Sequence, residues 1–229
     1  MSAAGVGREA VTYVGAERIA GPLVFVHGVR DIGYGEAVEI EHAGRLLHGR
    51  VLEVGRGVAV VEVFEGTAGL ALRATRVRFL ARPLETPVGI EMLGRTFDGR
   101  GEPLDGGPRP LAAELRDVNG MPINPVARDF PRDFIQTGVS AIDGMNTLVR
   151  GQKLPIFSAS GLHHDSLVAQ VVRQARLPGE ESEFAVVFAA IGVRHDVAES
   201  FRRSFEESGA LDRAALFLNL ADDPTSSAS

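Results

Sequence analysis

The segment that decides the fold runs from Phe134 to Val172 and has the sequence FIQTGVSAIDGMNTLVRGQKLPIFSASGLHHDSLVAQVV. Its pattern of apolar residues predicts a helix, a strand, a tight turn and a second helix, in this order. The turn lies where nucleotide-binding proteins carry a phosphate-binding loop of the form GxxxxGK[ST]. The segment therefore has the frame of a phosphate loop, and its chemistry depends on the residues within the turn.

The lysine and hydroxyl positions of this loop are occupied by other residue types. The corresponding window contains Ser158, Ala159, Ser160, Gly161, Leu162, His163, His164 and Asp165. A working loop places a lysine ammonium on the phosphates and a Ser or Thr hydroxyl on Mg²⁺. His164 replaces the lysine, and a histidine is mostly neutral at neutral pH. Asp165 replaces the hydroxyl; it could ligate Mg²⁺, but we expect it to cap the next helix. We interpret the window as a degenerate nucleotide-binding loop whose backbone N–H groups could still hold an anion.

Composition excludes several classes of protein. The chain has 229 residues, 45% of them apolar, and no cysteine, so it can build a core but no disulfide or thiolate metal site. Its net charge of −6 makes nucleic-acid binding improbable, because such binding relies on Lys and Arg. We see neither a secretory signal nor a run of about 18 apolar residues, so we expect no direct membrane insertion.

The N-terminal part has the pattern of a small β-barrel. Extended segments are predicted at 22–26, 37–41, 46–54, 58–64 and 75–79, with glycines between them. Several short strands at this spacing favour a closed barrel without exposed edges. We assign residues 1–82 to this domain, and we expect it to serve assembly, since no catalytic constellation is visible in it.

Residues 83–229 are predicted to form the second domain. Its first part, RTFDGRGEPLDGGPRP at 95–110, is so rich in Gly and Pro that we expect loops and no regular element. Asp98, Glu102 and Asp105 are interpreted as solvated turn residues rather than as a carboxylate cluster.

The rest of this domain alternates between helix and strand, which predicts a parallel sheet. Ser140 is expected to cap a helix that carries Asp143 in its first turn. A short strand is predicted at 152–157, although Pro155 weakens it. Asp165 should begin a helix with an apolar face, and 184–190 should be a strand buried on both faces.

The last predicted helix begins at Asp196 and ends at Gly209, and a buried strand follows at 215–220. Only about three strands are visible before the polar ending at 221–229, so we expect this domain to be incomplete.

Long segments of the chain resemble one known family. They are GPLVFV, LGRTFDGRGEPLDG, PINPVARDFPRDFIQTGVSAIDGMNTLVRGQKLPIFSASGL, FAVVFAAIG and ALFLNLADDPT. These are similar to the B subunit, or beta chain, of V-type and archaeal-type rotary ATPases. The resemblance covers about residues 11–225 and implies an N-terminal β-barrel followed by an incomplete α/β RecA-like domain of the P-loop NTPase type, truncated after its first part.

The resemblance also implies a function and partners. In this family three non-catalytic, regulatory B subunits alternate with three catalytic A subunits around a central rotor stalk, together with peripheral stalk subunits. The complex translocates protons or sodium ions and lies on the cytoplasmic side of the membrane, where ATP or ADP with Mg²⁺ could lie at an interface between subunits. Related catalytic subunits carry a glutamate after the glycine of the strand that matches 184–193, and this chain has Val193 there. We therefore expect no catalytic residue.

Three further residue pairs and the alternative functions complete the sequence-based expectations. His163 and His164 are interpreted as a solvated or interface pair rather than a metal site. Asp222 and Asp223 could hold Mg²⁺ or form a turn. Arg150 and Lys153 could face a neighbouring subunit, support a nucleotide or lie on the surface. Alternative functions are a non-functional remnant or adaptor and a weak self-sufficient ATPase that uses His164 and Asp165.

Overall fold

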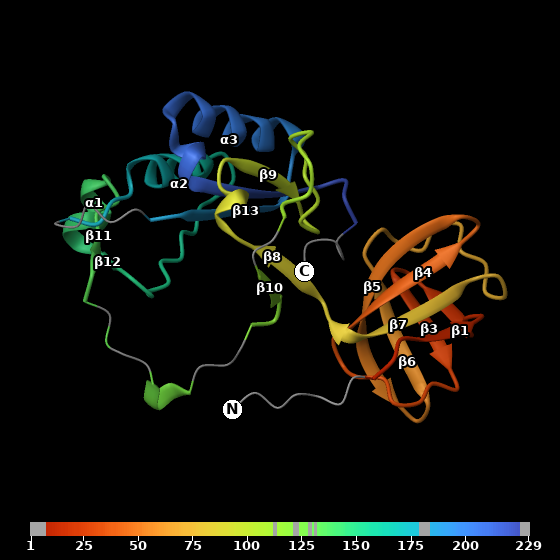
Figure 1. Ribbon diagram of the computed structural model, residues 1–229. Coiled ribbons are helices and arrows are strands. Elements are labelled where there is room, and N and C mark those ends of the chain that lie inside the picture. The colour runs from red at the N-terminus through yellow and green to blue at the C-terminus, as the bar shows by residue number, and fades with distance from the viewer. Residues whose placement is uncertain are drawn as a thin grey trace. The chain divides into compact units, whose positions relative to one another are not determined.

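The computed structural model describes residues 8–111, 114–120, 124–127, 130, 132–178 and 184–224. The chain forms two compact units (Figure 1). The first contains Met1–Val88, Glu114–Gly120 and Asp223–Ser229, and the second contains Gly89–Ala113 and Met121–Asp222. The domain assignment 1–82 and 83–229 stays a prediction, and the first unit extends past it by one short ribbon. No helix in the described part of the chain is long and apolar enough to cross a membrane.

The first unit is a curled antiparallel sheet. Its strands are β1 (Val11–Val14), β2 (Arg18–Ala20), β3 (Leu23–His27), β4 (Glu36–His42), β5 (Arg45–Gly55), β6 (Val58–Val63) and β7 (Arg76–Pro83), in the order β1-β7-β4-β5-β6-β3-β2. The two end strands, β1 and β2, are joined by only residues 15–17, so the sheet must curl to bring its two ends near each other. Figure 1 shows the curled sheet. The predicted barrel is confirmed. Sequence patterns do not reveal strands β1 and β2 individually, because they are short and mostly exposed.

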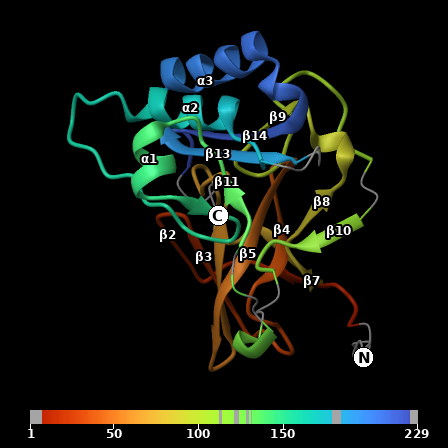
Figure 2. The same ribbon diagram turned by 90° about the vertical axis from the view of Figure 1, so that its left-hand side faces the viewer.

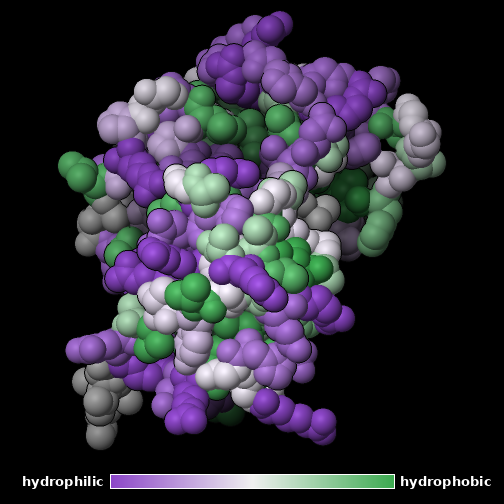
Figure 3. Space-filling model, turned by 90° about the vertical axis from the view of Figure 1, so that its right-hand side faces the viewer, coloured by the Kyte–Doolittle hydropathy of each residue, from purple (hydrophilic) through white to green (hydrophobic). Residues whose placement is uncertain are grey.

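One apolar core fills the inside of this sheet. Val24, Ile40, Val51, Val61 and Phe79 are completely buried. They alternate along their strands with outward residues, as a half-buried pleated strand requires. On the outside, charged side chains pair across strands, and hydrophilic residues prevail on the face shown in Figure 3, with smaller hydrophobic patches between them. The ribbon of β8 (Glu85–Val88) and β10 (Glu114–Asp117) completes the unit.

The second unit contains a three-stranded parallel sheet with two helices on one face. Its strands are β13 (Val186–Val193), β14 (Ala214–Leu220) and β9 (Arg95–Asp98), in the order β13-β14-β9. Helices α2 (His164–Gln174) and α3 (His195–Ser208) lie side by side over this sheet (Figures 1 and 2). Phe201 and Phe205 of α3 pack on Phe188 of β13, with ring centroids 4.7 and 5.1 Å apart.

Strand β9 corrects the prediction that residues 95–110 contain no regular element. Thr96 and Phe97 are buried, and Phe97 stacks on Phe217 of β14 with centroids 5.3 Å apart. Thr96 and Phe97 are β-forming residue types that precede the first glycine of the stretch. The average composition of residues 95–110 does not reveal this short strand, because the glycines and prolines that follow dominate the average.

The strand predicted at 152–157 is absent, and that prediction is wrong. Residues 152–159 belong to no helix or strand, and Pro155 has no N–H to donate. Before them, β11 (Phe134–Ile135) pairs with β12 (Leu148–Val149) around the short helix α1 (Ser140–Met145). The three-residue 3₁₀ helices Ile90–Met92 and Pro125–Ala127 and the longer Ala210–Arg213 complete the described elements.

Strand β13 is buried on one face only, which corrects the expectation of two buried faces. Phe188 and Ala190 face the helices, whereas Val187 and Ile191 are 72% and 64% exposed. The predictions for α3 and β14 are confirmed, and Gly209 ends α3 in the left-handed region at φ 69°. Glycine adopts this φ without the steric cost that a Cβ would add.

Candidate functional site

Helix α2 carries the candidate loop at its N-terminal end. Ala169 is buried against the sheet, and Val168 and Val172 pack beside it. At the other end of α2, the Arg213 guanidinium donates to the carbonyls of Val172 and Arg173, at 3.2 and 3.0 Å. These contacts satisfy carbonyls that a helix end leaves without a partner. The body of α2 is therefore fixed on the sheet, while the loop before it is exposed.

The His164 ring is turned back onto its own loop. Its Nδ1 lies 3.0 Å from the Ser158 hydroxyl and 3.2 Å from the Leu162 carbonyl. Its Nε2 lies 3.3 Å from a carboxylate oxygen of Asp165. Both ring nitrogens thus contact groups of the same loop, so the ring does not project from the loop as a phosphate-loop lysine would.

The eight predicted loop residues form an irregular loop with a turn at 160–161 and the start of α2. Residues 158–164 are exposed, and α2 begins at His164, one residue before the predicted start. The prediction that Asp165 caps α2 is wrong, because no side chain caps this helix and Asp165 faces His164 instead. A carboxylate at this position repels phosphate oxygens. The loop therefore lacks the lysine that would contact the phosphates and the hydroxyl that would contact Mg²⁺.

The turn before α1 is organised by Asp143. Its carboxylate accepts hydrogen bonds from the Thr137 hydroxyl and N–H, at 2.7 and 2.8 Å, and from the Gly138 N–H at 3.0 Å. These bonds, above all the one from the Thr137 hydroxyl, hold the pKa of Asp143 below its ordinary value. The predicted cap by Ser140 is wrong, since Ser140 is the first helical residue and no side chain caps α1. Asp143 satisfies the preceding backbone instead.

The carboxyl ends of β13 and β14 meet, which is where α/β sheets usually bind ligands. Val193 lies at this end, and its carbonyl accepts the Ala221 N–H at 2.8 Å. Its side chain packs against the apolar core, so it offers no group that could activate water. Asp222 is exposed just beyond β14. Within the described residues, no three His, Asp or Glu side chains come together as a metal site.

The carboxylates of Asp98, Glu102 and Asp105 are paired with arginines rather than simply solvated, and Asp98 is the last residue of β9 instead of a turn residue. Asp98 accepts from the Arg100 guanidinium at 2.9 Å. Asp105 pairs with Arg95, whose Nη2 donates at 2.8 Å, and the hydrogen bonds from Arg95 hold the pKa of Asp105 well below its ordinary range. Of the two cations left open, Arg150 lies 3.8 Å from Asp133, and Lys153 is exposed.

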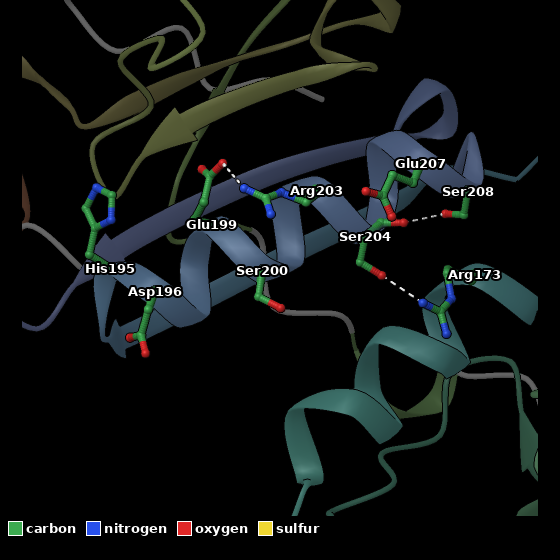
Figure 4. Close-up of a pocket in the computed structure, with 9 residues that line it drawn as sticks. All are labelled: Arg173, His195, Asp196, Glu199, Ser200, Arg203, Ser204, Glu207 and Ser208. Carbon is green, nitrogen blue, oxygen red and sulfur yellow. Dashed lines mark hydrogen bonds and ion pairs between the residues drawn. The ribbon is translucent and has the colours of Figure 1, made fainter.

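A groove between α2 and α3 has no counterpart among the sequence predictions. It is open, has a volume of about 640 Å³ and is lined mainly by polar residues of α3 (Figure 4). The lining residues are Arg173, His195, Asp196, Glu199, Ser200, Arg203, Ser204, Glu207 and Ser208. The Arg173 guanidinium donates to the Ser204 hydroxyl across it at 2.8 Å. In the sequence, the groove corresponds to the spacing of polar residues along 196–208. Because any solvated helix face has such a spacing, it does not predict a groove.

Two domain families match the chain. The β-barrel domain of the ATP synthase alpha/beta family matches residues 17–81. The nucleotide-binding domain of the same family matches residues 138–228, which include the candidate loop. Together the two matches cover more than half of the sequence.

Individual relatives agree with this family. The B subunit of the A-type ATP synthase from Aeropyrum pernix is 61% identical over 213 residues, which are 93% of this chain and 46% of the relative. The corresponding protein of Nitrosopumilus maritimus is 57% identical over 215 residues, 93% of this chain and 47% of that one. The one from Methanopyrus kandleri is 59% identical over 93% of this chain, and the match is 22% of the relative's length. The chain thus spans less than half the length of these relatives, and it belongs to the ATP synthase alpha/beta family.

Proposed function

We propose that the chain acts as a non-catalytic, regulatory B subunit of an A/V-type proton- or sodium-translocating ATP synthase or ATPase. In this role it assembles with catalytic A subunits in an alternating ring, together with rotor and peripheral stalk subunits. It works at the cytoplasmic face of the membrane without inserting into it. Its identity of 57–61% to the B subunits of A-type ATP synthases supports the B-type assignment.

The observation that carries the non-catalytic part of this proposal is the state of the loop at 158–165. Phosphoryl transfer needs fixed positive charge on the transferring phosphate and a positioned water. Here the lysine position holds a ring that contacts Ser158 and Asp165, and the expected glutamate position holds the packed Val193. The chain therefore contributes structure at this site, and the catalytic groups come from the neighbouring A subunit.

A self-sufficient ATPase that uses His164 and Asp165 is less well supported. Both side chains are about half exposed, at 50% and 45%. Solvent screens their charges, so neither is held in the water-free setting that makes electrostatic catalysis effective. An RNA translocase with a related core is disfavoured by the acidic charge balance.

Co-expression with the catalytic A subunit of the same operon tests the proposal. We expect a tagged chain to retain the A subunit through purification, and we expect His164→Ala to retain it equally, because His164 is assigned no catalytic role. Native mass spectrometry would give the stoichiometry. A folded chain that retains no A subunit would contradict the assignment.

A further inference from the structure

Glu36 is a buried carboxylate in the first unit that the proposed function does not use. The residue is 4% exposed at the start of β4. Its Oε1 accepts the Ala81 N–H at 2.7 Å, and its Oε2 accepts the Gly33 N–H at 2.9 Å. A buried charge of this kind is costly unless it is paired and hydrogen-bonded. The cation paired with it is Arg8, whose Nη2 lies 3.6 Å from Oε2.

The Ala81 bond fills a gap in the sheet. Residues 36 and 38 of β4 pair with residues 83 and 79 of β7, so one extra pair of residues on β7 bulges out between them. The Glu36 carboxylate supplies the acceptor that the ladder lacks at Ala81. The bulge lies at the end of β7, where the chain leaves the barrel sheet toward β8.

Two strained residues mark the same cluster. Among the described residues, four other than glycine have positive φ, and two of these, Ala43 and Arg56, lie in two-residue hairpin turns. The other two are Asp31 and Ala81, both at φ 55°. Arg8 donates to the Asp31 carbonyl, and Glu36 accepts from Ala81. Such residues persist only where their surroundings hold them, and they are frequent in clamps and switches.

We propose that Arg8, Glu36 and Ala81 form a latch through which the Arg8 side chain controls the end of β7. With Arg8 in place, the Glu36 carboxylate stays inside and holds Ala81 in its kinked conformation. Without Arg8, the carboxylate lacks a cation and turns toward water, because a buried charge that loses its partner is strongly disfavoured. Ala81 then loses its acceptor, and residues 80–83 relax. The Arg8 side chain is 48% exposed, so a partner that binds its guanidinium can open the latch.

A substitution at Gly33 provides a second way to disturb the latch. A Cβ built on Gly33 would lie 3.2 Å from the Arg8 Nη2 and 3.6 Å from the Glu36 Oε2. Gly33 is not in the left-handed region, so alanine fits its backbone. Gly33→Ala therefore requires the Arg8 guanidinium to shift by a few tenths of an ångström, without removing any charge.

Amide hydrogen exchange measured by NMR on the full chain tests the latch. In Arg8→Ala, the Ala81 amide should exchange about tenfold faster or more, whereas the Val77 and Phe79 amides of the same strand keep their rates. Gly33→Ala should show a smaller increase at Ala81. The matched control is Arg76→Ala, also on β7. It breaks an exposed ion pair with Glu41 of β4, at 3.8 Å, and should leave the exchange rate of the Ala81 amide unchanged.

Two results would overturn the latch. One is an Ala81 exchange rate in Arg8→Ala equal to that of the unmodified chain. The other is a common acceleration of Ala81, Val77 and Phe79, which would report general loss of stability instead of local release.

Discussion

His164 stands where a phosphate loop carries its lysine, and its imidazole is held by the loop itself. The loss of the lysine, the hydroxyl and the glutamate can be predicted from the sequence, because each is a change of residue type at a known spacing. The contacts of His164 with Ser158 and Asp165 cannot be predicted in this way. They depend on the backbone path of residues 158–163, which the residue types alone do not determine.

Asp143 is a second residue whose role follows from its surroundings. Because hydrogen bonds from Thr137 and Gly138 lower its folded pKa, it stabilises the fold at pH values above its unfolded pKa of about 3.9. Its contribution disappears as the pH falls through the lower, folded pKa. We expect Asp143→Asn to lower the melting temperature at pH 7, with a difference that shrinks below about pH 4.

Thermal unfolding followed by circular dichroism between about pH 3 and pH 7 measures this difference. Asp133→Asn is a suitable control, since the ion pair of Asp133 with Arg150 is exposed and 3.8 Å long. A difference between Asp143→Asn and the unmodified chain that stays constant down to about pH 3 would contradict the assigned role.

At the scale of elements, strand 95–98 and the segment 152–157 show what a sequence pattern can miss. The first is not predicted because glycines and prolines follow it closely, yet Phe97 of this strand stacks on Phe217. The second carries apolar residues but also Pro155, and it has no ladder in the described structure. Strands are stabilised by pairing with segments distant in sequence, so a local pattern predicts them less well than it predicts helices. The helix α3 and its end at Gly209 are predicted well, because an apolar stripe and a C-terminal glycine are local signals.

Replacing two glycines, one at the end of α3 and one inside α1, by alanine should change the stability of the fold in opposite directions. Gly209 has φ 69°, and a Cβ there would meet no atom within 4 Å, so the cost of Gly209→Ala comes from the backbone alone. We expect a loss of about 1 kcal/mol. Gly144 lies inside α1 with no positive φ, so Gly144→Ala should add about 0.5–1 kcal/mol. Urea unfolding of both variants measures the two shifts, and equal shifts of one sign would refute this account of the helix end.

At the scale of the whole molecule, the two compact units should unfold as separate cooperative transitions in urea. Both tyrosines of the sequence, Tyr13 and Tyr34, lie in the first unit, so tyrosine fluorescence follows that unit. The described α-helices all lie in the second unit. The ellipticity at about 222 nm, the helical band, therefore follows the unfolding of the second unit. We expect the second unit to unfold at lower urea, because β13 exposes Val187 and Ile191.

Core substitutions should move these transitions independently. Phe205→Ala removes a fully buried ring from α3 and should destabilise the second unit by about 3–5 kcal/mol, which lowers only the ellipticity midpoint. Val61→Ala, the matched change in the sheet of the first unit, should lower only the fluorescence midpoint. Coincident transitions that shift together in both variants would mean that the chain unfolds as a single unit.

The central claim is that residues 158–165, which precede helix α2 at the position of a phosphate loop, lack the chemistry of such a loop. Phosphate release from Mg²⁺-ATP by the purified chain, measured beside His164→Ala, tests it most directly. We predict release no faster than the buffer blank for both proteins. Release by the unmodified chain that His164→Ala abolishes would contradict the claim and assign catalysis to this loop.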